Sequence, residues 1–200
     1  MEPLEIGSLL HFGRWGGEDI EWRVLDIEPN RTLLITDKAI DCKQYHYKYE
    51  DITWSDCSLR AWLNGEFYQE AFNPSERAMI LEARIINDNN PLYGTNGGPD
   101  TRDNVFCLSI DEARIYYESA KERICYPTEY ARENGVWTSD SGACNWWLRS
   151  PGSKAQSAVD VDYDGYLFMS GEGIAGGLDA EFETIIAIEE AVRPALWISA

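Results

Sequence analysis

The run DVDYDGYLFMSGE, residues 160–172, places oxygen ligands at the spacing of a calcium-binding loop. Asp160, Asp162 and Asp164 precede a glycine in the order D-x-D-x-D-G, and Ca²⁺ prefers carboxylate oxygens in this pattern. The glutamate that closes such a loop is missing, because Gly171 stands at its position. Alternate carboxylates on a strand lie about 6.5–7 Å apart and cannot all converge on one ion. We therefore expect a solvated acidic face and no metal site here.

A cysteine and histidine pair is the second candidate for chemistry. His46 lies in QYHYKY, between Cys42 and Cys57 in the sequence. A thiolate beside an imidazole can act as a nucleophile, and the partners need only be close in space. The spacing matches no known catalytic signature, and buried cysteine is common. An enzyme with a Cys/His or carboxylate site stays an alternative, and free thiols in a reducing cytoplasm are the simplest account of five unpaired cysteines.

The segment 87–104 gathers further oxygen ligands in a stretch made almost entirely of turn-forming residues. This composition predicts a long loop, with a linker between two domains as the alternative. Whether the loop binds calcium stays open. Its candidate ligands are Asp88, Asn89, Asn90, Asp100 and Asp103.

The sequence ACNWWLRSPG, residues 143–152, combines two tryptophans with an arginine and a turn. Successive residues of a strand face opposite ways, so we expect one of Trp146 and Trp147 in the core and the other in a second layer or at the surface. Arg149 shares the face of Trp147. An outward tryptophan could stack on a sugar ring or anchor a protein contact. We expect structural roles for Trp62, Trp146, Arg149 and Arg193.

The elements that must position these residues follow from periodicity and from capping signals. The order of strands, helices and strands predicts an α+β fold in one domain over residues 1–200, with its core at about 6–198. The expected elements are a hairpin at 20–36, helices at 59–67 and from 73, a strand at 105–109, a helix from 110, a short helix ending at Gly135, a strand at 145–150, a hairpin turning at Asp164 and Gly165, a glycine-rich loop at 170–177 and a final strand at 191–198.

The charge of the chain limits its partners. Acidic residues number 35 against 17 basic ones, which gives a formal net charge of -18. Such a field repels nucleic acid and anionic membranes but allows cationic ligands and basic protein surfaces. The sequence has no signal-peptide pattern and no apolar run that could span a membrane, so we expect a cytoplasmic protein. It also has no phosphate-binding loop, no dinucleotide fingerprint and no zinc spacing, so no cofactor is expected.

The motifs TWSDCSLRAWLN, FYQEAF, VFCLS, WWLRSPG and VRPALWI together resemble an uncharacterised bacterial family, domain-of-unknown-function family 6273, over about residues 6–198. That family carries no established activity to transfer. The C-terminal half is also similar to C-type-lectin-like folds, including formylglycine-generating enzymes and the hypervariable receptors of diversity-generating retroelements. This resemblance implies a C-type-lectin-like domain with an N-terminal hairpin, central helices and C-terminal antiparallel strands with long loops. The cysteine pair of the formylglycine-generating enzymes is absent, because Cys144 stands alone in the last third.

The leading hypothesis is a non-enzymatic recognition module that binds a protein or a glycan, either cytoplasmic or associated with a phage. Loops on a rigid scaffold commonly carry recognition, so we expect the ligand at the loops 137–145 and 153–180. The alternatives are an enzyme and a structural domain of a larger assembly, and the oligomeric state is open. The expected ligand contacts are Trp137, Asn145, Trp147, Tyr163 and Tyr166.

Overall fold

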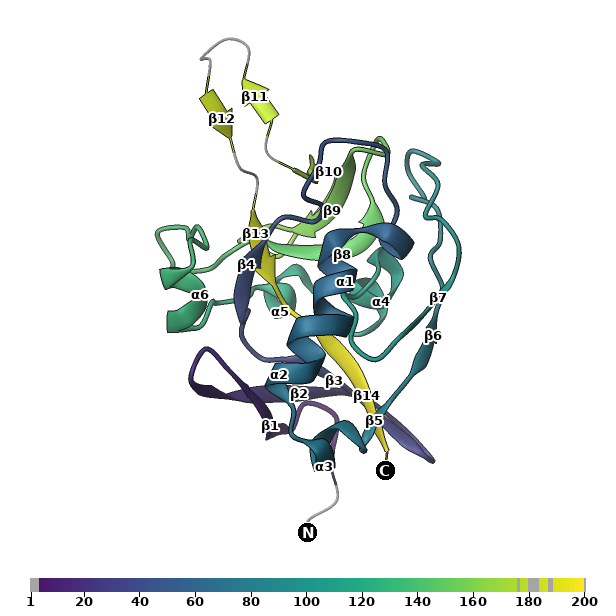
Figure 1. Cartoon of the computed structure of the whole chain (residues 1–200), viewed down its shortest axis with the longest axis vertical. Helices are drawn as coiled ribbons and strands as arrows, with labels where there is room; N and C mark the ends of the chain where they lie inside the picture. Colours follow the sequence, from purple (N-terminus) through teal and green to yellow (C-terminus); the bar gives the residue numbers. More distant parts are fainter. Residues whose placement is uncertain (1–3, 176, 180–183, 187–188, 200) are drawn as a thin grey trace.

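Two sheets form the frame of the molecule (Figure 1). The computed structural model describes residues 4–175, 177–179, 184–186 and 189–199. The first sheet contains, in spatial order, β1 (Leu9–Trp15), β2 (Glu18–Glu28), β3 (Arg31–Thr36), β14 (Ala195–Ser199) and β5 (Ile80–Leu81). The second contains β10 (Leu167–Gly173), β9 (Ser157–Val161), β8 (Trp146–Pro151), β13 (Glu190–Val192) and β4 (Asp41–Lys43). The fold is therefore mixed α+β, with strands predominating.

The hairpin expected at 20–36 is present as β2 and β3. Pro29 and Asn30 separate the two strands, and Glu28 lies opposite Arg31. Trp22 and Val24 alternate with more exposed residues and are buried, as a strand with one face on the core requires. The preceding strand β1 was not expected, because its apolar residues do not alternate regularly, and a bulge interrupts its pairing with β2 between His11 and Arg14.

The strand expected at 191–198 is in fact two strands that belong to different sheets. β13 lies parallel to β8 and antiparallel to β4, whereas β14 pairs antiparallel with β3 and β5. Arg193 and Pro194 separate them. Proline has no N–H to donate to a ladder, which favours a break in pairing at this point. The chain thus passes from one sheet to the other at Arg193–Pro194.

The helix expected at 59–67 is longer and less regular than its periodicity suggests. It runs as α1 (Ser58–Trp62), a π-helical turn (Leu63–Phe67) and α2 (Tyr68–Ala71). A 3₁₀ turn (Trp54–Asp56) precedes it. We expected Ser55 or Asp56 as the cap, but the Sγ of Cys57 accepts the hydrogen bond from the Arg60 N–H, at 3.4 Å. In Figure 1 this segment extends from the level of the second sheet to the level of the first.

Capping signals correctly predicted where the other helices begin, but they did not predict how long the helices are. The capping box of Asn73 and Glu76 begins α3 (Pro74–Arg77), which lasts one turn before β5 starts. The box of Ser109 and Glu112 begins α4 (Ile110–Ile115). Thr128 caps α6 (Glu129–Glu133), which ends before Gly135 as expected. The short helix α5 (Ala120–Arg123) was not anticipated.

Two expected elements differ from the structure. Residues 105–109 form no regular strand, because Phe106 makes only an isolated bridge to Ala195. The glycine-rich loop expected at 170–177 instead continues β10 as far as Gly173, and residue 176 lies outside the described residues. The turn-rich segment 87–104 is a loop up to β7 (Thr101–Asp103), which pairs with β6 (Ala83–Ile85), the strand that precedes the segment. A further pair of strands, β11 (Gly177–Asp179) and β12 (Thr184–Ile186), lies between β10 and β13 along the chain.

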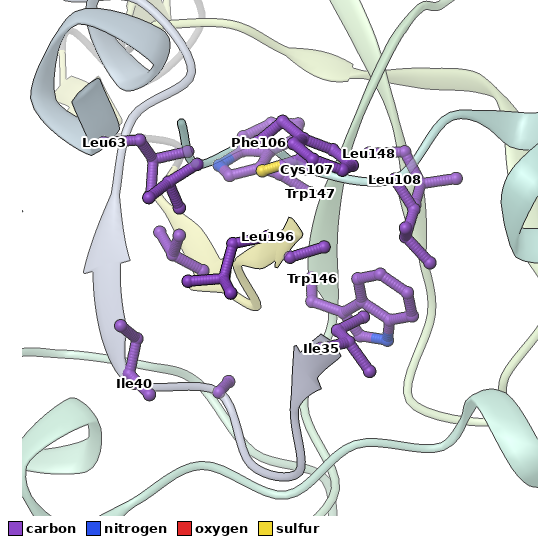
Figure 2. Close-up of a cluster of buried hydrophobic side chains, with 14 of the residues drawn as sticks. Ile35, Ile40, Leu63, Phe106, Cys107, Leu108, Trp146, Trp147, Leu148 and Leu196 are labelled. Carbon is purple, nitrogen blue, oxygen red and sulfur yellow. The ribbon is translucent and has the colours of Figure 1, made fainter. Parts of the chain in front are cut away.

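Both tryptophans of the WW pair are fully buried. Figure 2 shows their side chains within a cluster of apolar residues that come from both sheets and from the central segments. The Trp146 Nε1–H donates to the Arg123 carbonyl at 3.1 Å, and the Trp147 Nε1–H donates to the Lys43 carbonyl at 2.8 Å. A strand at the centre of a covered sheet has two buried faces, so neither ring reaches the surface.

The other residues expected to be structural are also packed inside the molecule. The buried Arg149 guanidinium forms an ion pair with Glu112 and donates to the carbonyls of Cys107 at 2.8 Å and Ile86 at 3.1 Å. Trp62 is half-buried and packs against Phe67, with ring centroids 5.3 Å apart. Arg149 therefore connects β8 to three other segments of the chain.

Replacing Trp146 by alanine should lower the free energy of unfolding by about 3–5 kcal/mol, because a fully buried ring and its hydrogen bond are both lost. Trp137 is exposed, so Trp137→Ala should change the free energy of unfolding by about 0.5 kcal/mol or less. Urea denaturation followed by circular dichroism measures both variants against the parent. Equal midpoints for the two variants would show that the assignment of Trp146 to the core is wrong.

Limited proteolysis tests the expectation of a single domain, which stays a prediction. The pairing of β3 with β14 brings together residues from both ends of the chain, so we expect one cooperative unfolding transition. Release of two fragments that each unfold cooperatively on their own would contradict this.

Candidate functional site

Two exposed aromatic rings meet at the end of the second sheet. Trp137 lies in the loop between α6 and β8, and Tyr163 lies in the turn between β9 and β10. Their ring centroids are 5.6 Å apart with an interplanar angle of 66°, which is the edge-to-face arrangement that aromatic pairs favour. Trp137 is 59% exposed and Tyr163 is 39% exposed. The pair is therefore ordered by its own contact but open to a partner.

Asn145 connects this ring pair to the sheet. Its Oδ1 accepts a hydrogen bond from the Tyr163 N–H at 3.0 Å, and its main-chain carbonyl accepts one from the Ala191 N–H at 3.2 Å. Asn145 therefore holds the β9–β10 turn against β13.

The β9–β10 turn is fixed by one carboxylate. The Asp162 Oδ1 accepts hydrogen bonds from the N–H groups of Asp164, at 2.9 Å, and Tyr166, at 2.8 Å. Gly165 has a φ of +83° and packs so closely on the Ala120 carbonyl that a side chain there would collide with it. Tyr166 projects from this turn and is exposed. We call Trp137, Asn145, Tyr163 and Tyr166 the aromatic surface.

Trp147 does not belong to the aromatic surface, so the expectation that it contacts a ligand is corrected. It is fully buried, and its ring packs edge-on against Tyr45 with centroids 5.7 Å apart. The alternation of side chains along the strand predicted that Trp147 faces away from Trp146. Alternation alone could not show that the loop containing Tyr45 covers the face of the strand that carries Trp147.

Three carboxylates are carried by strands of the second sheet: Asp160 on β9, Glu172 on β10 and Glu190 on β13. Burial, together with the charges of Glu190 and Glu172, raises the pKa of Asp160 to about 8. Burial and the charge of Glu172 also raise the pKa of Glu190 to about 7, against a lowering effect of the hydrogen bond from Asn145. We call these residues the carboxylate trio, and their mutual repulsion favours a cationic group nearby.

The expectation of a solvated acidic face is wrong for Asp160. Its side chain is only 1% exposed, and its Oδ1 has no hydrogen-bond partner among the described residues. β9 lies between β8 and β10, and both of its faces are covered, so the aspartate is enclosed despite its polar alternation. Glu172 and Glu190 could not be identified as partners from the sequence, because only the sheet order brings them near Asp160.

Three of the oxygen ligands considered for calcium in the loop 87–104 have structural partners. Asp103 is buried and pairs with Arg60 at 2.7 Å, while Asp100 pairs with Arg84 at 2.7 Å. The Asn90 side-chain amide donates to the carbonyls of Pro151 at 2.8 Å and Met169 at 2.9 Å. In the part of the chain that the structure describes, no group of three or more histidine, cysteine, aspartate or glutamate side chains is arranged to hold a metal ion.

The cysteine and histidine candidates are not arranged as a nucleophile and its base. The His46 Nε2 lies 3.1 Å from the Glu50 carboxylate, and its Nδ1 accepts from the Ser58 N–H at 3.2 Å. Burial raises the pKa of both the Cys42 and the Cys57 thiol to about 12. A thiol with so high a pKa is a poor nucleophile at neutral pH.

The carboxylate trio predicts an unusual dependence of stability on pH. An aspartate whose pKa is raised in the folded state binds its proton more tightly there than in the unfolded chain. Its contribution to stability is therefore present at low pH and is lost as the pH rises from about 4 to about 8. Asp160→Asn should remove this loss and raise the free energy of unfolding at pH 8 by a few kcal/mol, with little gain at pH 4.

Urea denaturation of the parent and of Asp160→Asn at both pH values measures the effect. Asp164→Asn is the matched control, because Asp164 is an exposed carboxylate of the same run. The raised pKa of Asp160 is refuted if the two asparagine variants show the same change in stability between pH 4 and pH 8.

Comparisons with known proteins identify the family of the chain and nothing further. No curated protein matches the chain, and no solved structure matches it. Among the described residues, no helix combines the length and the apolar character needed to cross a membrane. The model of the family described as "Domain of unknown function (DUF6273)" matches residues 29–200, which is most of the chain, and the chain therefore belongs to that family.

Proposed function

We propose that the chain is a non-enzymatic recognition module with a C-type-lectin-like fold, and that it binds a protein or glycan ligand at the aromatic surface. The observation that carries this proposal is the exposed pair of Trp137 and Tyr163. Other tryptophans, such as Trp22 and Trp54, are buried and donate their indole N–H groups inside the molecule. An exposed tryptophan held against a tyrosine is the kind of anchor that binding surfaces use.

The electrostatics of the site favour a ligand with a cationic group. The carboxylate trio belongs to the same sheet, and Asn145 joins that sheet to the aromatic surface through its contacts with Tyr163 and with Ala191, the neighbour of Glu190. The net charge of -18 attracts basic ligands over long distances. A protein segment that carries lysine or arginine beside an apolar residue therefore fits this surface better than a neutral glycan does.

The arrangement of the strands supports the proposed C-type-lectin-like fold. Strands from the N-terminal and C-terminal parts pair in the first sheet, and the loops that carry the aromatic surface adjoin the second. On this proposal, fixed strands hold variable loops, as a diversified receptor of bacterial or phage origin acting in the cytoplasm would require. A reverse transcriptase and a template repeat beside the gene would support that origin. The high thiol pKa values of Cys42 and Cys57 argue against nucleophilic catalysis by these two residues.

Peptide display and a glycan array tested with the same purified protein measure the proposed binding. We expect peptides rich in lysine or arginine to be selected. Trp137→Ala and Tyr163→Ala should each weaken their binding by about tenfold or more, since truncation of an anchor residue costs about 2 kcal/mol or more. Neither variant should lower the unfolding midpoint strongly, because neither ring belongs to the buried core.

Tyr93→Ala is the matched control. Tyr93 is a similarly exposed ring in the loop between β6 and β7, and its replacement should leave binding unchanged. If ligands selected by the parent bind Trp137→Ala and Tyr163→Ala as tightly as they bind the parent, the aromatic surface is not the binding site. Selection of neutral glycans alone would overturn the preference for a basic protein ligand.

A further inference from the structure

A cavity of about 500 Å³ lies where the end of β3, the segment between α4 and α6, and Arg193 meet. Its volume falls within the range of about 300–1,000 Å³ that is typical of small-molecule sites. It shares no residue with the aromatic surface. Its apolar and aromatic lining consists of Val24, Leu25, Tyr116, Tyr117, Ile124 and Tyr126.

Arg193 brings a buried positive charge to this cavity without an acidic partner. Its side chain is 2% exposed, and it donates only to main-chain carbonyls, those of Thr36 at 2.9 Å and Asp37 at 3.3 Å. Within the described residues, no carboxylate lies within 4.0 Å of its guanidinium. The Trp146 ring, with its centroid 5.0 Å from the guanidinium carbon, supplies only partial compensation. Burial of an unpaired charge is costly, so this arrangement favours an anion.

Two hydrogen-bond donors at the cavity have no acceptor among the described residues. They are the Nη1 of Arg193 and the Oη of Tyr117, and the Tyr117 side chain is only 4% exposed. The guanidinium carbon of Arg193 lies 5.5 Å from the centroid of the Tyr117 ring, so the two groups are neighbours. Buried donors in folded proteins almost always find an acceptor. An oxygen-bearing ligand would supply one to each.

Among the other charged groups at the cavity, Arg23 and Asp37 neutralise each other, whereas the exposed Glu122 carboxylate has only a main-chain partner. Arg23 pairs with Asp37 at 2.6 Å and also donates to the Gly7 carbonyl at 3.2 Å. The Glu122 carboxylate accepts a hydrogen bond from the Glu118 N–H at 2.8 Å. Arg193 is thus the lining charge that a ligand would have to match.

We propose that this cavity binds a small organic carboxylate with an aromatic or aliphatic body. The carboxylate oxygens accept hydrogen bonds from the Arg193 Nη1 and the Tyr117 Oη, and a charge-assisted pair with an arginine is among the strongest polar contacts in proteins. The tyrosine rings and the apolar side chains of β2 enclose the body of the ligand. This site is separate from the proposed recognition of a basic ligand at the aromatic surface, and each can fail without the other.

Isothermal titration calorimetry with phenylacetate and indole-3-acetate tests the proposal directly. The matched neutral probes are phenylacetamide and indole-3-acetamide, which keep the shape and lose the charge. We expect at least one acid to bind saturably at one site per chain, and its amide to bind at least about tenfold more weakly. Tyr117→Phe should weaken binding of the acid by about tenfold, because it removes one donor and keeps the ring.

Tyr166→Phe is the control, since Tyr166 lies on the aromatic surface, and it should leave the affinity for the acid unchanged. Tyr117→Phe avoids the loss of folding that a change of Arg193 itself would risk. The proposal is overturned if neither acid binds with a Kd below about 1 mM. It is equally overturned if acid and amide bind alike, or if Tyr117→Phe binds the acid as tightly as the parent does.

Discussion

The passage of the chain from the second sheet to the first, at Arg193 and Pro194, is held by hydrogen bonds to the end of β3. The Pro194 carbonyl accepts a hydrogen bond from the Thr36 N–H at 3.0 Å, and the Arg193 Nε–H donates to the Thr36 carbonyl at 2.9 Å. One residue at the end of β3 is thus bound through both of its main-chain groups by the residues that separate β13 from β14. Because the Arg193 guanidinium also stacks over the Trp146 ring of β8, the crossing connects both sheets through a single buried side chain.

This crossing helps to explain why the tryptophan and arginine motif is architectural, while the exposed rings, at which we propose recognition, lie outside it. Arg149 holds β8 to the segments that contain Ile86, Cys107 and Glu112, so the centre of the second sheet is fixed on both faces. The ends of that sheet carry loops whose residues are not needed for the core. Trp137 and Tyr163 lie there, and their contact with each other leaves most of the Trp137 ring open. On the proposed function, a rigid strand next to this exposed aromatic pair would preorganise the binding surface and limit the entropy lost on association.

Local signals in the sequence predicted the local features. The capping boxes at Asn73 and Ser109, the hairpin turn at Gly165 and the family resemblance all rest on short motifs, and the structure has each of these caps and turns. Exposure and strand order depend on contacts between distant residues, so they could not be derived in this way. The burial of Asp160 follows from the neighbours of β9, and the splitting of the last strand follows from pairings with β3 and β8. Of the expected contact residues, Trp137, Asn145 and Tyr163 come together, whereas Trp147 is covered by a loop that alternation cannot reveal.

The substitution Arg193→Lys tests the role of the crossing most directly, because it keeps the charge and removes the planar fork of donors. A lysine ammonium cannot reproduce the hydrogen bond from Nε to the Thr36 carbonyl together with stacking over Trp146. We expect urea denaturation at neutral pH to show a free energy of unfolding lower by about 2 kcal/mol or more, with one transition for both sheets. A lysine variant as stable as the parent would show that the two sheets do not depend on the Arg193 crossing.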